Sequence, residues 1–156
     1  MTTEEIISKF RARRYVPMPN IPGNRIFITD HSASTLVWVE DNIVIEHYML
    51  FPNIEVPLHS HPFINRLLYF SGDYTAYIVN NNTGMKFEKT FLDTDKHFIM
   101  PEEPMGQLHG SRTGPRGATM YNIQIWPKTV TNPLSASLEY LGPSIGPVHD
   151  RELSQK

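Results

Sequence analysis

The chain has 156 residues, of which 40% are hydrophobic and 19% are charged, with a formal net charge of −2 at pH 7. This length and composition predict one globular domain with a sizeable core, and the small net charge argues against nucleic acid or an anionic membrane as the main partner. The chain has no cysteine, which excludes disulfides, thiolate metal ligands and cysteine nucleophiles.

The first 24 residues predict a short helix and a linker. Thr3 precedes Glu4 and Glu5, which suits a helix N-terminus, and apolar residues follow at helical spacing over residues 3–13. The prolines between residues 17 and 22 end this helix. No segment resembles a signal-peptide core or reaches the roughly 20 apolar residues of a membrane span, so we expect a cytoplasmic protein without a membrane partner.

Residues 25–126 predict a β domain. Short segments rich in β-branched and aromatic residues alternate there with turn-forming clusters. The expected strands are 25–29, 35–40, 43–50, 55–61, 65–70, 74–80, 86–92, 97–100 and 119–126. Many short strands joined by tight turns are typical of an all-β sandwich or barrel.

The composition changes after residue 126. Residues 127–156 contain four prolines, two glycines and a charged end. We expect them to form an extended tail that packs over the β domain or a neighbouring subunit, with a disordered end from about residue 150. The expected organisation is therefore 1–24, 25–126 and 127–156.

Three histidines indicate a metal site. One residue separates His59 from His61, so on a β-strand both imidazoles lie on the same face. His109 follows about fifty residues later and can approach them from a distant strand. Three imidazoles can hold a divalent transition metal and leave coordination positions open for other ligands.

The spacing around the first two histidines resembles the first motif of the cupin superfamily. That motif reads glycine, five residues, His-x-His, three or four residues, glutamate, six residues and glycine. In this chain the register is filled by Asn53, His59, His61, Asn65 and Gly72.

The segment around His109 resembles the second cupin motif. Pro104, Gly106 and His109 match it, whereas Phe98 and Thr113 stand in its first and last positions. The resemblance covers about residues 35–126. It implies a jelly-roll β-barrel of the cupin type, with the metal near one end of the barrel.

Asn65 is the main departure from the motif, because the family usually has a glutamate ligand there. An amide oxygen is a weak neutral donor, so three neutral histidines would hold the metal, with or without Asn65. Glu55 shares the strand face of His59, but four strand residues place it roughly 13 Å away. A cupin that has lost its metal is the alternative.

Two tyrosines are candidate catalytic residues. If Asn65 faces the metal, strand alternation also points Tyr69 inward, and Tyr77 can join it from the paired strand. A tyrosine near a Lewis-acidic metal could orient a substrate or pass a proton. The alternative for Tyr69 is ordinary packing inside the barrel.

Polar residues on two other strands are further candidates. His47 shares its strand face with Ile43 and Ile45, which we expect to point inward, so it is a candidate catalytic base; the alternative is a hydrogen-bonded core histidine. Asn122 and Gln124 share a face of the last expected strand and could present polar groups to a ligand.

The resemblance implies a metal-dependent enzyme that acts on a small molecule. Similar three-histidine cupins include non-haem Fe(II) dioxygenases, our leading prediction, and Lewis-acid isomerases, epimerases and dehydratases, for which Zn²⁺, Ni²⁺ or Mn²⁺ would serve. A non-catalytic cupin that binds a small molecule is the third alternative. We expect a homodimer without a nucleic-acid partner, since no helix-turn-helix segment is present.

Overall fold

The fold was determined from a computed structural model that describes residues 25–91, 98–99, 105–142 and 144–147. The expected N-terminal helix at 3–13 and the expected disordered end lie outside these residues. Within them, no helix is both long and apolar enough to cross a bilayer.

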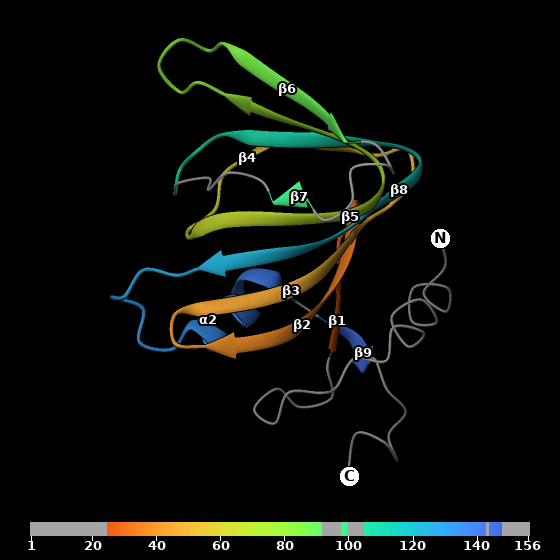
Figure 1. Cartoon of the computed structure of the whole chain (residues 1–156). Coiled ribbons are helices and arrows are strands. Elements are labelled where there is room, and N and C mark those ends of the chain that lie inside the picture. Colours follow the sequence, from red (N-terminus) through yellow and green to blue (C-terminus); the bar gives the residue numbers. More distant parts are fainter. Residues whose placement is uncertain (1–24, 92–97, 100–104, 143, 148–156) are drawn as a thin grey trace.

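In the described part of the chain nine strands form one antiparallel sheet, which confirms the all-β prediction (Figure 1). The sheet order is β6-β5-β8-β3-β2-β1-β9, with β4 also paired to β8 and β7 to β5. The strands are β1 (Arg25–Ile28), β2 (Ser32–Glu40), β3 (Ile43–Leu50), β4 (Glu55–His59), β5 (Ile64–Val79), β6 (Lys86–Phe91), β7 (Phe98–Ile99), β8 (His109–Ile125) and β9 (Ser144–Pro147). β6 and β9 end the path without pairing to each other, so the sheet curves but does not close as a complete barrel would.

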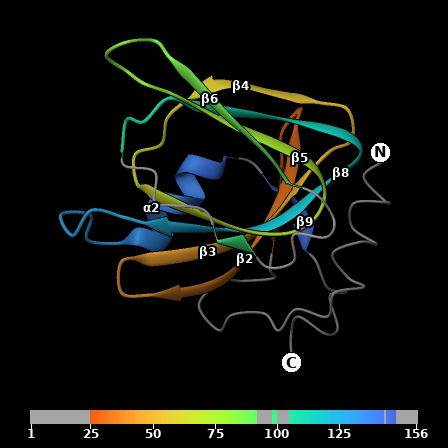
Figure 2. The ribbon, with the colours of Figure 1, turned by 45° about the horizontal axis from the view of Figure 1, so that its top comes forward.

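Strands β5 and β8 run through both arms of the folded sheet (Figures 1 and 2). They bend where Gly72 meets Gly117: Gly72 has φ +114°, and a Cβ atom there would lie 2.1 Å from the Gly117 carbonyl oxygen. Only glycine allows that backbone conformation and that approach. The expected strands 65–70 and 74–80 are therefore one long strand with a bend inside it.

β8 begins ten residues earlier than the expected strand at 119–126. Its first half contains three glycines and a proline, which resemble a loop in the sequence. In the fold this half lies between β4 and the second half of β5, and the ladders on both sides stabilise it.

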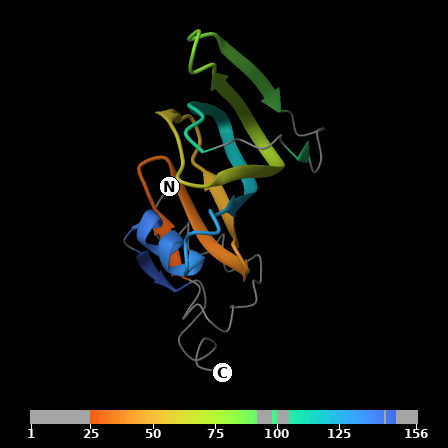
Figure 3. The ribbon, with the colours of Figure 1, turned by 90° about the vertical axis from the view of Figure 1, so that its left-hand side faces the viewer.

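The helix α2 (Pro133–Leu141) replaces part of the expected extended tail (Figure 3). The side chain of Asn132 caps its N-terminus by accepting a 3.0 Å hydrogen bond from the Ser135 amide. Pro133 occupies the start of the helix, where its missing N–H costs nothing, so this proline begins a helix instead of breaking one. Apolar α2 side chains pack on a core cluster that includes Phe63 and Trp126.

Candidate metal centre

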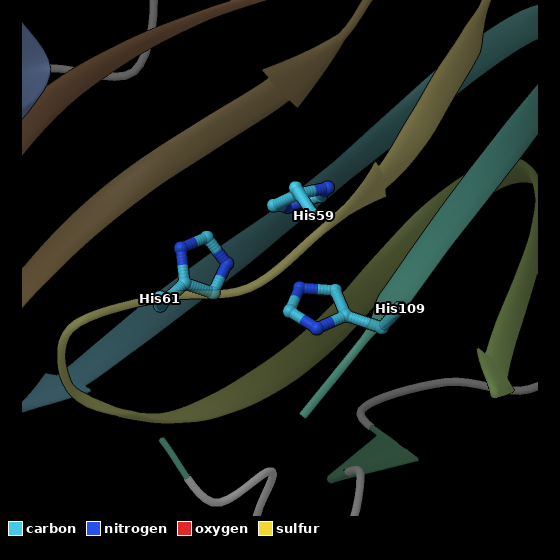
Figure 4. Close-up of side chains that lie close together, drawn as sticks. All are labelled: His59, His61 and His109. Carbon is cyan, nitrogen blue, oxygen red and sulfur yellow. The ribbon is translucent and has the colours of Figure 1, made fainter. Parts of the chain in front are cut away.

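The three motif histidines come together where β4 ends and β8 begins (Figure 4). His59 ends β4, His61 follows in the next segment, and His109 begins β8 directly opposite His59. One ring nitrogen from each lies within 4.8 Å of the other two. The cross-strand pairing of β4 with β8 thus brings a distant histidine to the His59-Ser60-His61 pair.

Short-range contacts fix the rings of His59 and His109. Nδ1 of His59 lies 2.8 Å from the Pro57 carbonyl oxygen, and Nδ1 of His109 lies 2.8 Å from that of Gln107. A carbonyl oxygen only accepts hydrogen bonds, so each Nδ1 carries the proton and each Nε2 keeps its lone pair. This is the tautomer in which metal-binding histidines are commonly held.

His61 is held from the other side of the site, by α2. Its Nδ1 lies 2.6 Å from the Tyr140 hydroxyl, and its ring stacks on Phe63 at 4.8 Å between centroids. Burial lowers the pKa of His61 to about 3, with further lowering by the charged forms of His109 and His59. Burial also lowers the pKa of His109, against the raising effect of its bond to Gln107. Both rings are therefore neutral at pH 7, as metal ligation requires.

The triad opens into a cavity of about 410 Å³. Asn65, Glu46, Asn122 and Ser34 contribute polar side chains to its lining. Apolar side chains from the core line it as well, among them Leu50, Leu67 and Tyr74. A small organic molecule with a polar end and an apolar body fits such a cavity.

Asn65 lines this cavity at the motif position of the family's glutamate. It is buried, and its Oδ1 has no hydrogen-bond partner. An amide oxygen and three imidazoles in the lining of one cavity give a nitrogen and oxygen donor set suited to a divalent first-row metal. The residues present therefore fit a metal ion.

One departure from the glycines of the motifs has a backbone explanation. Asn53 stands at a glycine position and has φ +54°, a left-handed conformation that asparagine tolerates better than most residues. Gly106 retains a glycine and has φ +81°. The local backbone of the motif is thus kept at both positions.

Glu46 is a cavity residue that the sequence reasoning missed. Its side chain is 2% exposed, and its Oε1 accepts hydrogen bonds from Asn122 Nδ2 and from Gln124 Nε2, the latter at 3.2 Å. Burial raises the pKa of this carboxyl group, while the side chains of Ser34, Asn122 and Gln124 oppose the shift. In the sequence, Glu46 stands out as the single acidic residue of the largely apolar segment 43–50.

The face of β3 that points to the cavity is the opposite of the expected one. Glu46 and Tyr48 line the cavity, whereas His47 lies on the other face of the sheet with its ring edge against Tyr121, 5.5 Å between centroids. If Ile43 and Ile45 pointed inward, strand alternation would place Glu46 and Tyr48 on the outer face. These two residues line the cavity, so the expectation for Ile43 and Ile45 was wrong.

Neither predicted tyrosine lines the cavity. Tyr69 is fully buried in the core, and its hydroxyl donates a 2.6 Å hydrogen bond to the Gly72 carbonyl oxygen. The Tyr77 hydroxyl donates to the Val56 carbonyl oxygen at 3.0 Å. The tyrosine that contacts a metal-site histidine is Tyr140, which lay in the expected tail.

No protein-family model matches the chain, and a search of curated protein sequences gives no significant match. The fold of the chain is similar to that of several solved structures. Oxalate decarboxylase from Bacillus subtilis at pH 4.6 superposes with a TM-score of 0.55 and 18% identity over 65% of this chain and 27% of that chain. A variant of that enzyme with one tryptophan replaced by tyrosine superposes with a TM-score of 0.55 and 18% identity, over 72% of this chain and 30% of the variant's chain. A structure of the same enzyme used to study its Mn(II) centres superposes with a TM-score of 0.53 and 18% identity, over 64% of this chain and 26% of that chain.

These matches span less than a third of the decarboxylase chain, and at 18% identity they establish the fold alone. Oxalate decarboxylase has the fold of the cupin superfamily. The chain therefore has a cupin fold, as the two motifs predict, with asparagine in place of the usual glutamate.

Proposed function

We propose that the protein is a metal-dependent enzyme that acts on a small molecule in the 410 Å³ cavity. His59, His61 and His109 would hold a divalent transition metal, and Asn65 Oδ1 would be a weaker fourth donor. The observation that carries the proposal is the convergence of three histidines, two of them with Nδ1 fixed by a backbone carbonyl. A core histidine without a metal does not need that arrangement.

The leading reaction is that of a non-haem Fe(II) dioxygenase. Three neutral imidazoles leave several coordination positions for substrate and dioxygen, and a bound Fe²⁺ would supply the redox chemistry. The apolar part of the cavity lining supports the proposal, because it limits the access of water to a reactive site.

A Lewis-acid lyase or isomerase is the second candidate, with Mn²⁺, Zn²⁺ or Ni²⁺. The neutral ligand set supports it because no ligand carboxylate reduces the positive charge of the metal. The structural neighbours are decarboxylases, one of them studied for its Mn(II) centres. Oxalate itself is a poor candidate substrate, since the described lining contains the buried acid Glu46 and no lysine or arginine.

Metal analysis and an oxygen-uptake screen test these proposals together. The protein is purified without added metal, analysed, and then loaded separately with Fe²⁺, Mn²⁺, Zn²⁺ and Ni²⁺ before small acids, phenols, thiols and amines are added. Oxygen uptake with Fe²⁺ would support the dioxygenase, and turnover without oxygen would support the lyase or isomerase. Ligand binding without any turnover would support the non-catalytic alternative.

The control is a pair of ligand variants. His59→Ala and His109→Ala should lose metal and turnover together. A metal-free protein whose ligand binding is unchanged by both substitutions would refute the metal-dependent proposal. The homodimer, the cytoplasmic location and the absence of a nucleic-acid partner remain predictions.

A further inference from the structure

Strand β6 forms one end of the sheet (Figures 1 and 3). Among the strands that the structure describes, only β5 pairs with it. The edge of β6 that points away from β5 is called the open edge below. The first five residues of the strand are exposed. Backbone N–H and C=O groups along such an edge can bond to a further strand.

The hydrogen bonds to β5 fix which residues face the open edge. In an antiparallel pair, directly opposite residues alternate between those that exchange hydrogen bonds and those that do not. The Asn80 amide donates to the carbonyl oxygen of Met85 at 2.8 Å. The amide of Val79, which lies opposite Lys86, donates instead to the carbonyl oxygen of Leu108. The open edge therefore carries the backbone groups of Lys86 and of the even-numbered residues that follow it.

Two large apolar side chains lie beside this open edge. Met85 and Phe87 are each 58% exposed. Because side chains alternate along a strand, both point to the same face of β6, and Lys86 and Glu88 point to the other face. Large apolar side chains exposed together on an unpaired edge are typical of a surface that contacts another strand.

Charge selects one register for the pairing of two copies of β6. Open-edge residues can pair only with open-edge residues, so a two-fold axis between the copies passes through a residue of the strand. An axis at Lys86, Glu88 or Lys89 places that residue opposite its own copy, and like charges directly opposite are destabilising. An axis at Phe87 places Lys86 of each copy opposite Glu88 of the other. Axes at the last two residues of β6 pair no opposite charges within the strand.

We propose that the protein forms a dimer in which the β6 strands of two copies pair antiparallel about a two-fold axis at Phe87. The two sheets then continue into each other. Lys86 of each copy and Glu88 of the other exchange backbone hydrogen bonds and form an ion pair. The two Phe87 rings meet at the axis, where a pair without hydrogen bonds brings side chains closest. This inference goes beyond the proposed function and does not depend on metal binding.

The contacts within one chain are compatible with this pairing. The Glu88 carboxylate accepts two hydrogen bonds from Arg112, both at 3.1 Å, and Nζ of Lys86 lies 3.2 Å from it. Arg112 lies opposite Glu55 of β4, so these four side chains share one face of the sheet. Each copy therefore brings two basic and two acidic side chains to that face, and the charges of the dimer balance.

Sedimentation velocity tests the interface first. The wild type should contain a species with twice the 18.0 kDa mass of one chain, which dissociates on dilution. Lys86→Glu and Phe87→Ser should each weaken the dimer about tenfold or more. Lys128→Glu, exposed in the turn before α2, is the control and should leave it unchanged. Circular dichroism checks that each variant is folded. A monomeric wild type, or a dimer unaffected by both β6 variants, would overturn the inference.

Mixing two charge variants tests the register. Lys86→Glu and Glu88→Lys each place like charges opposite in a homodimer, so each variant alone should be mainly monomeric. In a mixture, the two kinds of chain again place an acid opposite a base at both pairs, and a 1:1 dimer should form. Two variants that remain monomeric after mixing would refute the axis at Phe87.

A single introduced cysteine locates the axis independently. The chain has no cysteine, so Phe87→Cys carries one thiol in each copy. Only a residue at the axis faces its own copy at a distance that a disulfide spans. Under mild oxidation Phe87→Cys should form a covalent dimer at least about tenfold faster than Thr90→Cys, an exposed position away from the axis. Equal rates would contradict the proposed pairing.

Discussion

The histidine triad and the wall formed by Glu46, Asn122 and Gln124 line or support one cavity, but contacts of different range hold them. His59 and His109 are fixed by carbonyl oxygens two residues away along the chain. Glu46 is fixed by amides 76 and 78 residues away. Local contacts thus orient two of the three histidine rings, whereas the wall exists only when β3, β8 and α2 are packed together.

Because of this difference, we expect the triad to matter mainly for metal binding and the wall mainly for the stability of the fold. His59 and His61 are half-buried around the end of β4, and His109 is buried at the start of β8. The wall is buried, and Gln124 in it bonds to Glu46, Trp126 and Ser137. We therefore expect changes in the wall to lower the free energy of unfolding, and changes near the triad to lower metal affinity.

The largest effect on stability is expected for Gln124→Leu. It removes a donor from Glu46 and the acceptor of Trp126 Nε1 and Ser137 Oγ, so the free energy of unfolding should fall by about 3 kcal/mol. Denaturant unfolding measures the loss. A loss below about 1 kcal/mol, or a loss of metal binding by the folded variant, would contradict the division between the two regions.

Tyr140→Phe should affect the triad instead. It removes the hydrogen bond to His61 Nδ1, and we expect metal affinity to fall about tenfold with little change in stability. Competition with a chelator measures the affinity. Tyr121→Phe, on the other face of the sheet, is the matched control and should leave affinity unchanged. Equal effects from both substitutions would show that α2 does not support the metal centre.

Asn65→Asp tests whether the orphaned Oδ1 faces the ion. A carboxylate is a stronger donor to a divalent cation than an amide, so metal affinity should rise about fivefold. Chelator competition again measures the change. Unchanged or weaker affinity would remove Asn65 from the donor set and leave the three histidines alone.

The smallest effect is expected at the exposed ion pairs of β6. The side chains of Arg112 and then Lys86 lower the pKa of Glu88 to about 2. A lowered pKa stabilises the fold above the unfolded value of about 4.5 and loses that effect as the pH falls toward 2. Solvent screening makes it small, so Glu88→Gln should shift Tm by no more than about 2 °C at pH 7. A larger shift in a thermal melt would show that stability is not concentrated in the buried wall.

The sequence predicts the triad well because the spacing of its histidines is visible in the chain. Alternation places His59 and His61 on one face, and the motif register brings His109 to them. The same reasoning identifies most strands, since their apolar patterns depend on neighbours in the chain. It also places Asn65 at the cavity, where its amide is buried.

The features that the sequence did not predict depend on tertiary contacts. Gly72 suggests a turn, and only the approach of Gly117 shows a bend inside a strand. Pro133 suggests a break, and only its place after Asn132 shows a helix start. The inward face of β3 could not be chosen because both faces carry buried residues, Glu46 on one and His47 on the other.

X-ray absorption spectroscopy of the metal-loaded protein tests the central claim most directly, because it counts the imidazoles around the ion. For wild type loaded with Zn²⁺ we predict three nitrogen scatterers with imidazole character at about 2.0–2.1 Å, and two in His109→Ala. The remaining ligands should be oxygen. A wild-type spectrum without imidazole scattering, or one identical to that of His109→Ala, would contradict the three-histidine metal centre.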